Sequence, residues 1–151
     1  MHTQGGAELK GNCICGSVSF EIKGQVPGLY HCYCTLCQKQ GGTASNAATV
    51  VYLEYFRWIS GESEIQKWNK DTGFSSHFCR NCGSPVPNVF KSKYVWVPFG
   101  LIENVSPKLK ANLWLSSKPD WAIPAVLERN YDSAPEDIEE YIQYLNSGEN
   151  A

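Results

Sequence analysis

The chain has 151 residues, of which 42% are hydrophobic and 13% aromatic, enough apolar material for one domain with a hydrophobic core. Thirteen basic and fifteen acidic side chains give a net charge of −2, which does not suit general binding to nucleic-acid phosphates. No apolar run approaches the roughly 20 residues that span a bilayer, and residues 1–12 lack a secretory signal, so we expect a soluble, cytoplasmic protein without a membrane partner.

Short alternating runs predict a mainly β domain over residues 1–151. Residues 17–22 (SVSFEI) and parts of 29–34 (LYHCYC) alternate apolar and polar side chains at period two, which is typical of half-buried strands. Glycine and proline separate these runs from further candidates and indicate tight turns between short strands. The further strand candidates are 47–53, 64–69, 74–78 and 94–98.

One helix is expected near the C-terminus, over about residues 135–146. Ser133 is its candidate N-cap, and Pro135 suits an early helical position. A second, shorter helix is expected just after Cys37, where the two glycines at 41 and 42 would end it. The C-terminal helix should bury one face, because apolar residues recur there at i, i+3, i+4 and i+7: Ile138, Tyr141, Ile142 and Leu145.

Seven cysteines dominate the chemistry of the sequence. Seven is an odd number, so a closed set of disulfides would leave one thiol over. In a reducing compartment, metal binding is the favoured explanation for so many cysteines. They form three groups: Cys13 and Cys15; Cys32, Cys34 and Cys37; Cys79 and Cys82.

The first and third groups together predict a closed zinc site. The C-R-N-C-G segment at 79–83 is typical of a metal knuckle, in which two thiolates two residues apart converge on one ion. Cys13 and Cys15 can complete a tetrahedron if they lie on a strand, because alternate residues point to the same face. Such a site would tie the start of the chain to its middle. The alternatives are unmetallated buried cysteines or a redox dithiol.

The middle group predicts a second zinc site of a different kind. It supplies three ligands within six residues, and no eighth cysteine exists to complete a tetrahedron, which is the pattern of catalytic zinc with an open position. The alternatives are closure by His77 or a carboxylate, or an iron–sulfur cluster, although C-x-C-x-x-C matches neither ferredoxin spacing. His31 is expected to point away, because strand alternation would aim Cys32 and Cys34 at the metal.

The cysteine motifs and two further segments resemble the glutathione-dependent formaldehyde-activating enzyme family, which includes centromere-protein-V-like proteins. The similarity covers roughly residues 8–125. The segments that carry it are GNCICGSVSF (11–20), HCYCTLC (31–37), FRWISGE (56–62), FCRNCGS (78–84) and KPDW (118–121).

The resemblance implies an Mss4-like fold of several small antiparallel sheets with two zinc ions. It implies a structural zinc on Cys13, Cys15, Cys79 and Cys82, and a catalytic zinc on Cys32, Cys34 and Cys37. The family reaction adds the thiol of glutathione, the implied co-substrate, to formaldehyde and yields S-hydroxymethylglutathione. A carbon–sulfur lyase acting on a small thiol and a small aldehyde is therefore the expected function.

Contacts to the substrate are less directly indicated. Lys39 and Arg80 each lie next to a ligating cysteine and are candidates to pair with glutathione carboxylates; the alternative is an ordinary solvated charge. The five tryptophans are assigned to the core or to sheet faces. Departures from the family pattern fall in 38–51 and 109–115, which are candidate pocket regions. The candidate proton donors are Tyr33, Thr43, Ser45 and His77.

Two other functions compete with the enzyme. In the first, both zincs are structural and the domain is an interaction module of the Mss4-like type. In the second, suggested only by the centromere-protein relatives, the protein associates with nucleic acid. The acidic balance and the lack of a basic tail disfavour the second.

Overall fold

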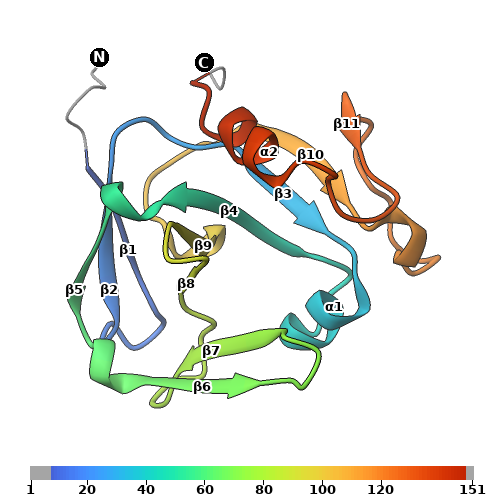
Figure 1. Ribbon diagram of the computed structural model, residues 1–151. Coiled ribbons are helices and arrows are strands. Elements are labelled where there is room, and N and C mark those ends of the chain that lie inside the picture. The colour runs from blue at the N-terminus through green and yellow to red at the C-terminus, as the bar shows by residue number, and fades with distance from the viewer. Residues whose placement is uncertain (1–7, 149–151) are drawn as a thin grey trace.

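The computed structural model describes residues 8–148, which form three small sheets and two short helices (Figure 1). A three-stranded antiparallel sheet has the order β1-β2-β5. Its strands are β1 (Glu8–Asn12), β2 (Ser19–Lys23) and β5 (Phe56–Ser60). Gly11 of β1 lies against the ring of Phe20, where a Cβ atom would collide with it, so glycine lets the two strands approach.

The largest sheet has six strands in the order β11-β10-β3-β4-β9-β8. Strands β3, β4, β9 and β8 pair antiparallel, whereas β10 runs parallel to both β3 and β11. The sheet is therefore mixed, where the family resemblance implied antiparallel sheets. The bounds are β3 (Leu29–Cys32), β4 (Asn46–Tyr52), β8 (Asn88–Phe90), β9 (Tyr94–Pro98), β10 (Leu109–Leu113) and β11 (Arg129–Asn130).

A separate two-stranded hairpin consists of β6 (Ile65–Asn69) and β7 (Ser75–Cys79). Helix α1 (Thr35–Gly41) follows β3, and Figure 1 shows it on the side of the molecule where β7 begins. Four 3₁₀ turns complete the regular structure: Leu53–Tyr55, Glu62–Glu64, Phe99–Leu101 and Leu115–Ser117.

The mainly β prediction is confirmed, and each predicted strand has a counterpart whose bounds agree to within two residues. Five strands had not been predicted: β1, β5, β8, β10 and β11. In most of these five strands, buried and exposed residues do not alternate, so the sequence lacks the period-two pattern by which strands are predicted. Strand β10 is buried on both faces, including Lys110 with only 3% of its surface exposed. Lys110 is tolerated there because its ammonium group donates hydrogen bonds to Tyr144 O and Ser147 Oγ.

The C-terminal helix α2 (Ile138–Leu145) is shorter than the predicted 135–146. Its N-cap is Asp137 rather than Ser133: the Asp137 carboxylate accepts a hydrogen bond from Glu140 N at 3.1 Å. The predicted buried face is confirmed. Tyr141, Ile142 and Leu145 are buried in one core cluster with residues of the six-stranded sheet.

Helix α1 begins before Cys37 rather than after it, since Cys34 is its N-cap and accepts a hydrogen bond from Cys37 N. The predicted end is confirmed, because the C-cap Gly42 has φ 68°, the left-handed conformation that glycine adopts without strain. No helix in the part of the chain described is long and apolar enough to cross a membrane.

Candidate functional site

The four cysteines of the first and third groups converge. Their sulfur atoms lie within 4.8 Å of one another. Cys13 and Cys15 sulfurs are 3.7 Å apart, and Cys15 and Cys79 sulfurs are 3.8 Å apart. A tetrahedral zinc with bonds of about 2.3 Å places its sulfurs about 3.8 Å from one another. The donor set and its spacing therefore fit a closed zinc site.

The local backbone that positions Cys13 and Cys15 is a turn. Strand β1 ends at Asn12, and residues 13–18 form the connection to β2. The prediction that strand alternation aligns the two thiols is therefore wrong. The turn closes with Gly16 N donating to Cys13 O, and Gly16 has φ 82°. A similar turn holds Cys79 and Cys82. Gly83 N donates to Cys79 O there, and Gly83 also has φ 82°.

The FRWISGE segment braces this cluster, a role that sequence reasoning missed. Ser60 Oγ donates to Ser17 O at 3.1 Å, and a Cβ at Gly61 would collide with that same carbonyl oxygen. Ser17 Oγ in turn lies 3.1 Å from the Cys15 sulfur and 3.4 Å from the Cys79 sulfur. The hydrogen bond between the side chains of Cys82 and Ser84 lowers the pKa of Cys82 to about 5, so the thiolate that a metal needs is favoured.

The second cluster consists of Cys32, Cys34 and Cys37, whose sulfurs also lie within 4.8 Å of one another. Cys32 ends β3, Cys34 caps α1, and Cys37 lies in the first turn of that helix. Only Cys32 is on a strand, so alternation does not align Cys34 as predicted. The strand-to-helix turn brings the three sulfurs together instead.

No histidine or carboxylate of the described residues joins this trio. His31 lies on β3 with its ring 6.3 Å from that of Tyr33. His77 lies on β7 opposite Lys67, and burial followed by the charge of Lys67 lowers its pKa. Three sulfur ligands with room for a fourth donor are the arrangement of an open zinc site.

Hydrogen bonds among the three sulfurs make their titration unequal. The hydrogen bond between Cys37 and Cys32 raises the pKa of Cys37. Hydrogen bonds from Cys32 and Cys37 lower the pKa of Cys34. Cys34 is therefore the first of the three thiols to lose its proton, and Cys32 and Cys37 donate hydrogen bonds to its sulfur. A divalent cation would release the other two protons, because coordination to a metal favours the thiolate.

Asn46 supports this cluster and was not predicted as a site residue. From the start of β4, its Nδ2 donates to the sulfur of Cys37 on α1 at 3.0 Å, while its Oδ1 is buried without a partner among the described residues. A hydrogen bond to a ligating sulfur offsets part of its charge and fixes its orientation. The only sequence signal is its place nine residues after Cys37, in the region that departs from the family pattern.

We expect Asn46→Ala to weaken metal binding at this cluster by about 10- to 100-fold, the usual effect of losing a partner of a metal ligand. Competition with a chromophoric chelator would measure the dissociation constant of the weaker site. Asn88→Ala is the matched control, because Asn88 is another carboxamide of the pocket that Cys37 lines, and it makes no hydrogen bond to the Cys37 sulfur. Equal affinities for the two variants would contradict the role of Asn46.

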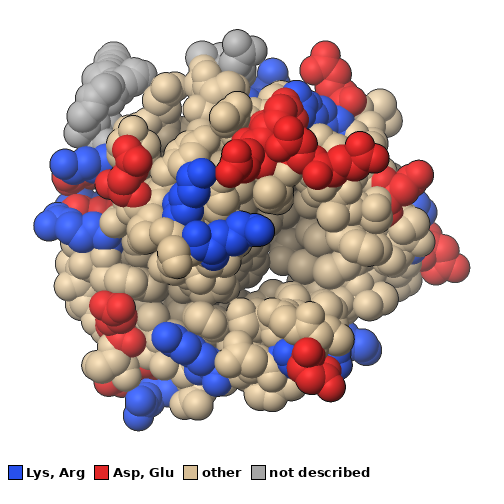
Figure 2. All heavy atoms as spheres, in the orientation of Figure 1, with Lys and Arg blue, Asp and Glu red and all other residues tan. Residues whose placement is uncertain are grey.

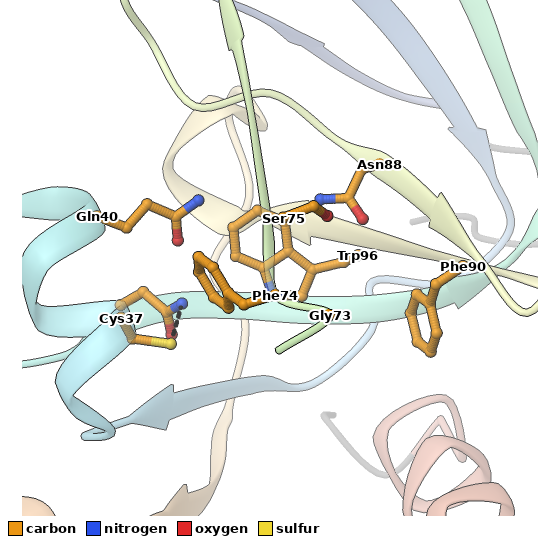
Figure 3. A pocket seen from close by; sticks show the side chains of 9 residues that line it. Cys37, Gln40, Gly73, Phe74, Ser75, Asn88, Phe90 and Trp96 are labelled. Atoms are coloured by element: carbon orange, nitrogen blue, oxygen red, sulfur yellow. Dashed lines mark hydrogen bonds between the residues drawn. The ribbon is translucent and has the colours of Figure 1, made fainter. Parts of the chain in front are cut away.

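A pocket of about 250 Å³ opens beside Cys37 (Figure 3). Gln40 and Asn46 come from the predicted region 38–51, whereas none of its lining residues comes from 109–115. Trp96 of β9 also lines it, while packing against the main core cluster as expected for a core or sheet-face residue. The remaining lining residues are Gly73, Phe74, Ser75, Asn88 and Phe90.

The other expected substrate contacts do not line this pocket. Lys39 is exposed on α1 next to Gln40. Arg80 follows Cys79 at the four-cysteine cluster and donates to Ser63 O at 3.2 Å. The four candidate proton donors are absent from the lining as well: Tyr33, Thr43, Ser45 and His77.

The sequence matches the family model described as glutathione-dependent formaldehyde-activating enzyme over residues 8–117. The chain belongs to this family. A solved structure of a Rhodobacter sphaeroides protein, a structural genomics target, is 25% identical with a TM-score of 0.53. The match covers 65% of this chain and 91% of that one. No curated protein matches the sequence. As a member of this family, the chain combines the family fold with two clusters that could hold zinc.

Proposed function

We propose that this protein adds a low-molecular-weight thiol to a small aldehyde at the cluster of Cys32, Cys34 and Cys37. The supporting observation is the convergence of three sulfurs, with no fourth protein ligand among the described residues, beside an open pocket. In the reaction a sulfur–carbon bond forms, the carbonyl double bond becomes a single bond, and the thiol proton ends on the oxygen. The product is a hemithioacetal, and nothing is oxidised or reduced.

Family membership supports glutathione as the thiol and formaldehyde as the aldehyde. A zinc ion held by the three thiolates would supply an open coordination position and would lower the pKa of an entering thiol. The residues of the chain do the rest. Asn46 holds Cys37 in place, and the walls of the pocket keep the aldehyde next to the sulfur that attacks it.

The oxygen that becomes negative needs hydrogen-bond donors. Gln40, Ser75 and Asn88 bring neutral donors to the pocket, and in this proposal they replace the four donors expected from sequence. Lys39 lies next to Gln40 and is proposed to pair with a glutathione carboxylate outside the pocket. Arg80 has less support, because it lies at the four-cysteine cluster.

Sulfur coordination provides the direct test. With both clusters filled by zinc, four and three sulfur ligands average 3.5 per zinc, and a bound thiol should raise that average to 4. Zinc-edge X-ray absorption with and without millimolar glutathione would measure the change. Faster hemithioacetal formation than the spontaneous reaction should accompany it.

An unchanged average, together with no acceleration, would reject the enzyme and favour the interaction module. A histidine contribution to the spectrum that disappears in His77→Ala would lead to the same conclusion. In that case the second cluster would be closed by a rearranged protein ligand.

A further inference from the structure

Among residues 8–148, no charged side chain lines the pocket beside Cys37. Cys37, a proposed metal ligand, is the one titratable residue in the lining. The polar atoms of the walls belong to neutral groups: the carboxamides of Gln40, Asn46 and Asn88 and the hydroxyl of Ser75. A carboxylate placed there would lose its hydration without gaining a basic side chain to pair with, which is costly.

Three aromatic rings provide the apolar part of the walls. Phe74 lies in the turn between β6 and β7, Phe90 ends β8, and Trp96 lies on β9 (Figure 3). Trp96 packs against the core cluster that contains Tyr30, and its strand pairs with β4 on one side and β8 on the other, so its position is fixed. Fixed aromatic faces are suited to stacking on another planar group.

Some polar groups of the walls are available to a ligand. Gln40 Nε2 donates to Ser76 Oγ at 3.3 Å, and Asn46 Nδ2 is used by Cys37. Within residues 8–148, the side chains of Ser75 and Asn88 make no hydrogen bond to the protein. They can therefore orient a neutral carbonyl or hydroxyl group between the rings.

The size of the pocket exceeds the needs of formaldehyde. Its volume of about 250 Å³ corresponds to roughly eight water molecules at about 30 Å³ each. Formaldehyde has two non-hydrogen atoms and would leave most of the aromatic surface wet. A larger planar molecule would displace that water and bury the ring faces, which is favourable in proportion to the apolar area covered.

We propose that this pocket selects an uncharged aldehyde that carries a planar aromatic group, in preference to formaldehyde or to an anionic aldehyde. This inference rests on the proposed thiol addition and names the electrophile for it. The thiol sulfur bonds to the aldehyde carbon, the thiol proton passes to the aldehyde oxygen, and the aromatic group remains unchanged between Phe74 and Trp96.

Isothermal titration of the zinc-loaded protein without thiol tests the selection by the pocket. Benzamide and benzoate are matched planar probes that differ in charge and do not react. We expect benzamide to bind at least ten-fold more tightly than benzoate. This is a demanding test, because benzoate could also bind the metal through a carboxylate oxygen, which would strengthen benzoate binding and not benzamide binding. Equal or tighter binding of benzoate, or no binding of benzamide at millimolar concentration, would overturn the proposal.

Two neighbouring residues of β8 provide matched variants. Asn88 lines the pocket, whereas Val89 does not line it and is 43% exposed. Asn88→Lys should shift the preference toward benzoate by at least ten-fold, and Val89→Lys should leave it unchanged. The same shift in both variants would show that benzoate responds to surface charge and would overturn the assignment of this pocket.

A kinetic comparison separates this inference from the proposed function. With glutathione as the thiol, benzaldehyde should give a higher kcat/KM than formaldehyde, and 4-carboxybenzaldehyde should give a lower one than benzaldehyde. Acceleration with formaldehyde alone would overturn the inference and leave the thiol addition standing. Failure to accelerate any pair, with benzamide still bound, would reject the thiol addition instead.

Discussion

Cys79→Ser is expected to leave the chain unfolded or insoluble. Cys79 is fully buried at the end of β7, and its sulfur joins the hairpin of β6 and β7 to the turn that holds Cys13 and Cys15. The surrounding core cluster contains only four buried residues, of which two are cysteines, so few apolar contacts would compensate for a lost metal. Structural zinc contributes on the order of 10 kcal/mol or more to folding in small domains.

Circular dichroism and the soluble fraction after expression would measure this effect. Arg80→Ala is the control, because Arg80 is exposed at the neighbouring position and lies outside the set of sulfurs. The control should remain soluble with native dichroism. If Cys79→Ser were soluble, folded and still loaded with two metal ions, the four-cysteine cluster would not be the structural site.

Cys37→Ser is expected to give the opposite result, a folded protein that has lost one metal ion and its activity. The three sulfurs of this cluster come from residues 32–37, so the metal there joins segments that the backbone already holds together. Backbone pairing of β3 with β4 and β10 and the capping of α1 do not depend on the side chain of Cys37. The free energy of unfolding should therefore change little compared with Cys79→Ser.

Metal content, circular dichroism and the rate of hemithioacetal formation would be measured on the same preparation. We expect one zinc per chain, a native spectrum and a rate equal to the spontaneous background. Thr35→Ala, a change at an exposed residue of the same helix, should retain two zinc ions and full activity. Unfolding of Cys37→Ser with normal folding of Cys79→Ser would mean that the two roles are reversed.

Several strands could not be predicted because their stability depends on partners distant in the chain. Strand β1 has only two buried residues in five, and one of them is Gly11, which depends on the ring of Phe20. Strand β10 contains Lys110, whose burial is stabilised by acceptors near the C-terminus. Neither case leaves a local hydrophobic period that would indicate a strand.

The sequence by itself determined the mainly β class, the buried face of the last helix and the grouping of the cysteines. These features are local, since two thiols separated by two residues in a tight turn approach each other whatever surrounds them. The tertiary structure decided which residues surround Cys37. Asn46, Phe74, Asn88 and Trp96 belong to four separate segments, and the pairing of β4 with β9 and of β9 with β8 brings three of these together. Neither the hydrophobic period nor the spacing of motifs predicts that these residues lie together, because each is positioned by long-range strand pairing and not by its neighbours in the chain.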